Sequence, residues 1–238
     1  MNKIKKLPKK YQPKGFEILY EDRDIIVGNK APGFLTVSAL WNKEQTIHAA
    51  LNRYVRKGSL QSRKCVYVVH RLDQATSGVM VFAKTEQAQK FLKDHWKNTL
   101  KIYYAVVHGR LAQKSGTLSS YLVEDEDYVM HSTPSAGKQG KLAHTAYTVV
   151  KETDQFSFVR IDLLTGRKNQ IRVHFADHGH PVVGDDKYGT ADPGRERLAL
   201  HSQSITLTHP FRGERMTFTA ELPEYFSALI GKFKLPSS

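Results

Sequence analysis

An imidazole, a guanidinium and a carboxylate occur close together in the stretch His70–Gly78. The apolar runs Cys65–Val69 and Val79–Ala83 flank it, so the sequence predicts a polar loop between two buried strands. Loops of this kind carry functional groups on a rigid scaffold. The carboxylate of Asp73 could act as a nucleophile or a base once its surroundings hold it ionised. Alternatively, Asp73 accepts backbone hydrogen bonds in an ordinary turn and Arg71 pairs with a surface acid.

The composition indicates an anionic partner. The 238-residue chain has 36 Lys and Arg against 23 Asp and Glu, which leaves a net charge of +13. This excess favours nucleic acid first and an acidic membrane surface second. Membrane binding requires a basic amphipathic helix, which the lysine-rich residues 1–15 do not supply because Pro8 and Pro13 interrupt them. No apolar stretch is long enough for a signal peptide or a transmembrane helix, so the sequence predicts a cytoplasmic protein without a membrane partner.

The single cysteine, Cys65, excludes a disulfide framework and a four-cysteine zinc site. Because it lies in an apolar run, we expect a small core residue in a reducing compartment. A single domain of this length buries roughly 70–75% of its unfolded surface. The fold therefore requires neither a metal nor a disulfide.

The elements around the loop follow from apolar periodicity and from turn residues. These patterns predict, in order, strands at Phe16–Tyr20 and Asp24–Lys30, helices at Gln45–Lys57 and Thr85–Thr99, and a strand at Lys101–Gly109.

A second group of elements is predicted in the later part of the chain. Leu142–Lys151 and Phe156–Leu164 form a hairpin, and a helix begins within Thr165–His174 with Asn169 as a possible cap. Residues 110–140 are expected to form short strands, and we interpret the acidic run within them as a solvated turn.

Three short motifs contain the residues with the most reactive side chains. The first is His-Arg-Leu-Asp at 70–73, followed by Thr-Ser-Gly at 76–78, and the second is Lys-x-Tyr-x-Ala-x-Val-x-Gly at 101–109. The third is Gly166–His174. All three resemble motifs of the RluA-type pseudouridine synthases, with Lys168 and Asn169 in place of the threonine and histidine of the family. The resemblance extends over residues 16–226, with Ala31 in place of the proline that is more common in the opening segment.

The resemblance implies that the protein isomerises uridine in RNA to pseudouridine. The reaction detaches uracil, turns it and rejoins it through carbon, so it implies no metal, nucleotide or nicotinamide cofactor. In the family, the aspartate that aligns with Asp73 is catalytic, and the tyrosine that aligns with Tyr103 packs against the target base. The arginine that aligns with Arg172 favours the ionised carboxylate. A strand's period of two places the adjacent Tyr104 on the opposite face from Tyr103. Whether Asp73 attacks the base or the ribose stays open.

RNA contact is assigned on the same basis to His70, Arg71, Thr76 and Arg167. The target base must leave its stack, at a cost of a few kcal/mol. Stacking on Tyr103 recovers roughly 1–3 kcal/mol of this. Arg71 is the candidate to fill the space that the base vacates and to contact phosphates.

The implied fold is α+β, with a mixed, mostly antiparallel central sheet, flanking helices and a cleft that holds the three motifs. The predicted organisation is a basic flexible arm at 1–15, a catalytic domain at 16–230 and a tail at 231–238. The small RNA-binding domain that precedes the catalytic domain in many members is expected to be absent, and the lysine arm is a hypothetical partial substitute. The chain has no heptad pattern, so we expect a monomer.

The substrate is not specified by these residues. The family modifies ribosomal and transfer RNAs, and recognition rests on loop shape more than on long sequences. Selectivity is expected in the loops 38–46, 110–140 and 186–197.

Two alternatives have other chemistry. A metal hydrolase could use His174, His178 and His180 with Asp185 and Asp186, because the first two imidazoles lie one helical turn apart. That turn lacks a glutamate to act as base. A non-catalytic RNA-binding protein with the synthase fold is the other alternative, against which stands the joint presence of the three motif residues.

Overall fold

The computed structural model describes residues 8–38, 45–59, 61–137, 139–189, 197–233 and 235. The lysines before residue 8 and most of the loops 38–46 and 186–197 lie outside these residues. The chain forms two compact units: unit 1 is Met1–Leu100 with Ser202–Glu221, and unit 2 is Lys101–His201 with Leu222–Ser238. Among the described residues, none of the helices has the length and apolar character that crossing a membrane requires.

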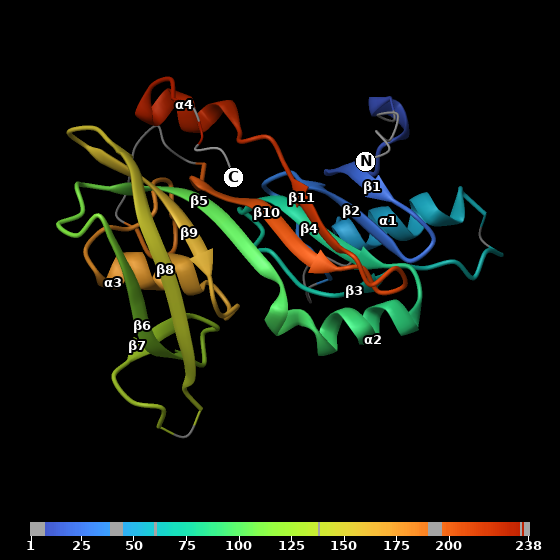
Figure 1. Ribbon diagram of the computed structural model, residues 1–238, viewed down its shortest axis with the longest axis horizontal. Coiled ribbons are helices and arrows are strands. Elements are labelled where there is room, and N and C mark those ends of the chain that lie inside the picture. The colour runs from blue at the N-terminus through green and yellow to red at the C-terminus, as the bar shows by residue number, and fades with distance from the viewer. Residues whose placement is uncertain are drawn as a thin grey trace. The chain divides into compact units, whose positions relative to one another are not determined.

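Unit 1 is built on a β-sheet (Figure 1). Its strands are, in sheet order, β1 (Phe16–Glu21), β2 (Ile25–Lys30), β4 (Ser77–Ala83) and β10 (Leu200–Thr208), with β3 (Tyr67–Val68) paired to β4 and β11 (Arg215–Thr219) paired to β10. The β1–β2, β2–β4, β3–β4 and β10–β11 pairs are antiparallel. β4 is buried along its whole length, which accounts for its continuous apolar sequence.

The helices of unit 1 are α1 (Ile47–Arg56) and α2 (Glu86–Asp94), with short 3-10 turns at η1 (Lys9–Tyr11) and η2 (Trp96–Asn98). Each α-helix begins after a threonine whose hydroxyl oxygen accepts a backbone hydrogen bond. The distance is 3.0 Å for Thr46 and 3.1 Å for Thr85. α2 packs against β3 and β4, and its apolar face joins a core that includes Ile25, Val27, Val79, Val81, Ala88, Leu92 and Ile205.

Unit 2 holds a second set of antiparallel strands, with helices packed on them (Figure 1). In sheet order these are β5 (Leu100–His108), β9 (Phe156–Leu163), β8 (Lys141–Glu152), β6 (Ser115–Glu124) and β7 (Met130–Thr133). The helix α3 (Gln170–Asp177) contacts β6, β7 and β8, and α4 (Glu224–Ile230) contacts β9. The mixed helices and antiparallel strands confirm the predicted α+β class.

Most predicted strands and helices are confirmed within a few residues, but three differ in length. The helix predicted at Thr85–Thr99 ends at Asp94, before the 3-10 turn η2, and β6, in the region of predicted short strands, has 10 residues. The third difference lies just before the loop. The run Cys65–Val69 forms only the two-residue β3, and Cys65 is half-buried rather than a core residue. The pairing with β4 stops there because the side chain of His70 takes the next hydrogen bond. Its Nε2 accepts from the backbone N–H of Val81 at 3.1 Å.

The second half of the predicted flexible arm has defined contacts. Gln12 accepts a hydrogen bond from the backbone of Ile18 through its side-chain oxygen, at 2.9 Å. Pro13 is buried, and the carbonyl of Gly15 accepts from the N–H of Ala31 at 2.9 Å. Residues 8–15 are therefore built into unit 1.

Candidate active site

The loop between β3 and β4 presents a half-buried carboxylate, Asp73. The carbonyl of Asp73 accepts from the backbone N–H of Thr76 at 3.1 Å, which closes a turn just after the carboxylate. The turn feeds into Gly78, whose φ of +116° and contact with the backbone of Ser202 exclude any Cβ. His70 fixes the other end of the loop, because its ring also stacks on Trp96 with centroids 4.6 Å apart.

The segment that follows β2 braces this loop. The hydroxyl of Thr36 donates to the carbonyl of Leu72 at 2.9 Å, and the N–H of Leu72 donates back to the same hydroxyl at 3.2 Å. Gly33 and Gln74 make a second reciprocal pair, because the N–H of Gly33 donates to the carbonyl of Gln74 and the Gln74 side chain donates to the Gly33 carbonyl. Asp73 therefore lies between two residues that are both anchored.

A buried lysine ends β2 beside the carboxylate. Lys30 is fully buried, and its Nζ donates to the carbonyls of Ala31 and Gln74, both at 2.9 Å. Burial lowers the pKa of Lys30 to about 7, while the negative charge of Asp73 opposes this fall. In its protonated form, Lys30 supplies a positive charge close to Asp73 within unit 1 itself.

Tyr103 and Tyr104 lie side by side on β5, and both side chains are buried. Tyr104 stacks on Phe158 with ring centroids 4.9 Å apart, so it belongs to the packing of unit 2. Burial raises its pKa. Tyr103 is predicted to lie on the opposite face of β5 and to be the tyrosine that packs against the target base.

Arg172 on α3 is held by a buried ion pair. Its Nε donates to Oδ2 of Asp185 at 2.8 Å and its Nη2 donates to Oδ1 at 2.6 Å, which gives a bidentate contact. Asp185 also accepts the backbone N–H groups of Lys187 and Tyr188, and the guanidinium lies 5.3 Å from the centre of the Tyr188 ring. The predicted role of Arg172 toward Asp73 stays a prediction, but the orientation of its guanidinium is set within unit 2.

Asn169 stands at the N-cap of α3, as predicted, but its side chain does not cap the helix. Its φ is +50°, and its Oδ1 instead accepts from the hydroxyl of Tyr188 at 3.2 Å. Gln170 organises this turn, because its Oε1 accepts from the hydroxyl of Thr165 and from the backbone N–H of Arg167. Gln170 thus positions Arg167, which is predicted to contact RNA.

The four predicted RNA contacts differ in exposure. Arg71 and Arg167 are exposed, although Arg167 Nε also donates to the carbonyl of Leu142 at 3.2 Å. Thr76 is only 2% exposed, so its side chain lies inside unit 1 and its observed contribution is to the turn. His70 is half-buried and braces the loop, as described above.

The histidines of the metal hydrolase alternative have protein partners. His174 is buried between two hydroxyls, with Nδ1 at 2.8 Å from Thr145 Oγ1 and Nε2 at 3.0 Å from Ser120 Oγ. Burial lowers the pKa of His174 to about 4, so it is neutral at pH 7. Nδ1 of His178 contacts the carbonyl of His174 at 2.8 Å. These contacts suit structural histidines rather than metal ligands.

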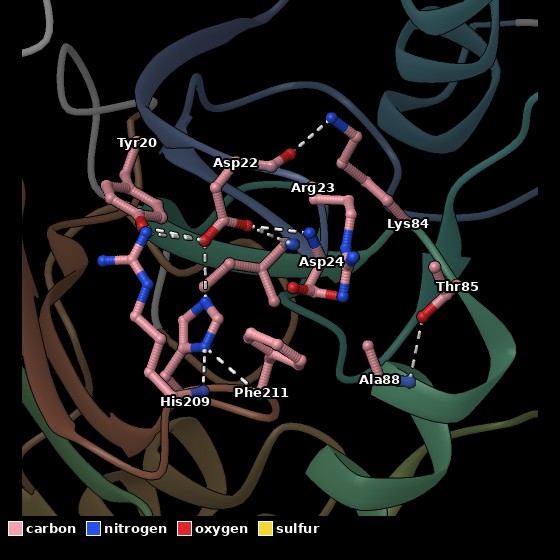
Figure 2. Close-up of polar contacts among 11 residues, drawn as sticks. Tyr20, Asp22, Arg23, Asp24, Lys84, Thr85, Ala88, His209 and Phe211 are labelled. Atoms are coloured by element: carbon pink, nitrogen blue, oxygen red, sulfur yellow. Dashed lines mark hydrogen bonds and ion pairs between the residues drawn. The ribbon is translucent and has the colours of Figure 1, made fainter.

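Asp22, Asp24 and His209 form the one group of described residues with a spacing that suits a metal ion. Figure 2 shows Asp22 between Tyr20 and His209. Nδ1 of His209 accepts two backbone N–H groups, so Nε2 carries the proton and donates to Asp22 at 2.8 Å. Burial acts to raise the pKa of Asp22, but the N–H groups of Ile25 and Asp24 outweigh it and lower the pKa. The group therefore suits a structural role, in which it joins the β1–β2 turn to the β10–β11 turn.

Comparison with known proteins identifies the family. A profile described as RNA pseudouridylate synthase matches residues 24–177. The dual-specificity RNA pseudouridine synthase RluA of Yersinia pestis is 37% identical over 217 residues, which cover 86% of this chain and 98% of the relative. The ribosomal large subunit pseudouridine synthase D of Blochmanniella floridana is 34% identical over 236 residues, which cover 91% of this chain and 72% of the relative. The structure of human RNA pseudouridylate synthase domain containing 1 matches with a TM-score of 0.74 at 25% identity. The match covers 98% of this chain and 94% of the human chain.

The segment that matches the profile contains all three predicted catalytic residues, Asp73, Tyr103 and Arg172. The likeness to relatives extends over most of the chain, beyond the motifs alone. This chain belongs to the RNA pseudouridylate synthase family, whose members are isomerases that act on RNA.

Proposed function

We propose that the protein converts specific uridines of RNA to pseudouridine with Asp73 as the catalytic carboxylate. The observation that carries this proposal is the anchoring of Asp73. It is the half-buried acid of a loop whose neighbouring residues are hydrogen-bonded on both sides, and the amino group of Lys30 lies close enough to interact with its charge. A carboxylate becomes an effective nucleophile or base when its position and its charge are held in this way.

We assign supporting roles to Tyr103 and Arg172. Tyr103 stacks on the flipped uracil, which offsets part of the cost of taking the base out of its stack. Arg172 stabilises the ionised carboxylate and fixes its orientation through its planar guanidinium. The reaction moves the uracil from nitrogen to carbon attachment on the same ribose, so the proton lost from the base carbon returns to the ring nitrogen.

For the substrate, we propose stem-loops of ribosomal or transfer RNA. One relative is named for the large ribosomal subunit and another for dual specificity. The net charge of +13 suits a polyanionic partner of this kind. We further propose that the protein acts as a monomer in the cytoplasm.

Pseudouridine mapping of total RNA tests the proposed activity directly. Cells that lack the gene should lose modification at one or a few uridines of ribosomal or transfer RNA, and a plasmid copy should restore it. An unchanged map would contradict the enzymatic assignment and favour an RNA-binding protein that keeps the synthase fold.

Replacement of Lys30 with Met should slow pseudouridine formation about tenfold or more. The change keeps the length of the side chain but removes the donor shared by Ala31 and Gln74. Because Gln74 follows Asp73 directly, the loop loses one anchor beside the carboxylate. Single-turnover rates on the mapped RNA measure the effect. Lys84→Met, at a half-buried lysine of unit 1 that also donates to a backbone carbonyl, is the control for lost stability.

The lowered pKa of Lys30 also predicts how the reaction rate and the free energy of unfolding change with pH. The pKa of Lys30 is about 7 in the folded protein and 10.5 in the unfolded chain, so the folded form loses its charge first as pH rises. The rate should therefore fall above about pH 7, while the free energy of unfolding rises between pH 7 and 10.5. Lys30→Met should lack both trends. Equal slopes in both proteins would show that Lys30 does not titrate in this range.

A further inference from the structure

We propose that a basic hollow at the C-terminal end of α1 is a second RNA contact, which binds the phosphate backbone of the substrate outside the catalytic loop. The hollow has a volume of about 400 Å³ and lies between α1 and the segment 8–14, all within unit 1. The proposal rests on the proposed function, because the RNA bound there is the RNA that is modified.

The charge of the hollow is of one sign. Lys10 and Lys14 line one side, and Arg53 and Lys57 line the other. The described residues that line it include no Asp or Glu. Four cations around one concave surface attract a polyanion and release the counterions condensed on it when it binds.

Helix electrostatics alone do not account for this cluster. Arg53 lies in the last turn of α1, where a cation complements the helix dipole in any protein. Lys10 and Lys14 belong to a different segment, and their approach to the same hollow brings like charges together. An arrangement that costs repulsion in the free protein is favourable when a bound anion neutralises it.

The wall formed by the segment 8–14 is fixed. The N–H of Tyr11 donates to the carbonyl of Pro8 at 2.9 Å, Gln12 accepts from the backbone of Ile18, and Pro13 is buried. The cations on this wall therefore lose little backbone freedom when RNA binds, in contrast to those of a flexible tail.

An exposed aromatic ring adjoins the cations. Tyr11 lines the hollow and is 57% exposed, and Nζ of Lys10 lies 4.9 Å from the centre of its ring. A basic groove with an exposed aromatic side chain can bind the backbone and stack an unpaired base, which is the usual arrangement for single-stranded RNA. The ring favours RNA over an anionic lipid surface as the occupant.

α1 connects the hollow to the catalytic loop. At its first turn, Ile47 and His48 donate backbone hydrogen bonds to the carbonyls of Leu35 and Thr36, and Thr36 in turn holds Leu72. The helix has 10 residues, and a helix of that length spans ~15 Å. One RNA stem-loop can therefore reach both sites.

The test compares two triple variants with equal loss of charge. The first variant combines Lys14→Gln, Arg53→Gln and Lys57→Gln, which removes three cations from the hollow. The second combines Lys90→Gln, Lys93→Gln and Lys97→Gln, which removes three exposed cations from α2 and the turn after it. Binding of unfractionated bacterial transfer RNA is measured across a salt series. The first variant should bind at least tenfold more weakly, with a salt slope smaller by about two to three. The second should stay within about twofold of the wild type.

A further pair isolates stacking. Tyr11→Ala should weaken binding of a labelled single-stranded oligouridine severalfold, and Tyr11→Phe should retain it, because stacking requires the ring and not the hydroxyl. Thermal unfolding of every variant confirms that the fold is kept.

Three outcomes would overturn the proposal. The first is equal weakening in both triple variants, which would mean that only net charge matters. The second is unchanged binding in the hollow variant. The third is loss of binding to vesicles of anionic phospholipid with RNA affinity unchanged, which would assign the hollow to a membrane surface.

Failure of the proposed function gives a different result. The hollow variant should reach the wild-type rate of pseudouridine formation at saturating protein, but it should need more protein to do so. If the wild type binds transfer RNA through the hollow and forms no pseudouridine in any cellular RNA, the hollow assignment stands and the proposed enzymatic function fails.

Discussion

Asp73→Asn should abolish pseudouridine formation, with a rate lower by roughly 10⁴-fold. Asparagine keeps the shape of the side chain and the turn that the Asp73 carbonyl makes with Thr76, but it cannot act as nucleophile or base. RNA affinity should change by less than about twofold, because the protein keeps its basic surface. Pseudouridine mapping of cells that carry the variant in place of the gene provides the measurement.

The matched control is Asp94→Asn, which makes the same change of charge at an exposed position on α2. This variant should keep the wild-type rate. If Asp73→Asn retained activity, another carboxylate would have to be the catalytic group. If it lost both activity and RNA binding, the loop would be acting through binding rather than chemistry.

Arg172→Met should destabilise the protein by roughly 3–5 kcal/mol. The guanidinium side chain is 7% exposed and that of Asp185 is 0% exposed, so removal of the arginine leaves a buried charge without its partner. For a chain of this size, the change corresponds to a drop in Tm of roughly 6–20 °C. Thermal denaturation measures it, and pseudouridine formation is expected to be lost as well.

A double variant separates stability from chemistry. Asp185→Asn in the Arg172→Met background removes the unpaired charge and keeps an oxygen for the N–H groups of Lys187 and Tyr188. Most of the lost stability should return, but activity should not if Arg172 acts on the reaction. Recovery of both would assign Arg172 a structural role alone.

The control for this prediction is another bidentate pair in unit 2. Arg160 contacts Asp162 through two hydrogen bonds of 2.8 Å, but both side chains are more than a third exposed, at 35% and 39%. Arg160→Met should cost less than about 1 kcal/mol, because water screens the exposed pair. A comparable loss in both variants would show that burial does not decide the cost.

The elements were predictable because their periodicity is local. The apolar runs of β2 and β4 and the threonine caps of α1 and α2 can be read in windows of a few residues. Asp73, Tyr103 and Arg172 are predicted from motifs of similar length. The family assignment follows from those same motifs and is confirmed by the comparisons.

The supports of the site were not predictable in this way. Lys30 reads as a polar strand end, and its burial depends on the carbonyl of Gln74, 44 residues away. Asp185 was considered only as a metal ligand, because its ion pair with Arg172 requires the chain to turn back over 13 residues. Packing also decides the burial of Thr76. It likewise decides that Asn169 accepts a hydrogen bond from Tyr188 instead of capping α3.

The discontinuity of unit 1 also affects how the protein is made. β4 and its sheet neighbour β10 are separated by more than a hundred residues, most of them in unit 2. At a synthesis rate of about 5–20 residues per second, β10 leaves the ribosome roughly 6–25 s after β4. Until then the nascent chain carries an apolar strand with one edge paired only to the two-residue β3, and an open edge of this kind is a surface that chaperones cover. The candidate catalytic loop, which leads directly into β4, therefore gains this neighbouring strand only after all of unit 2 up to β10 has been synthesised.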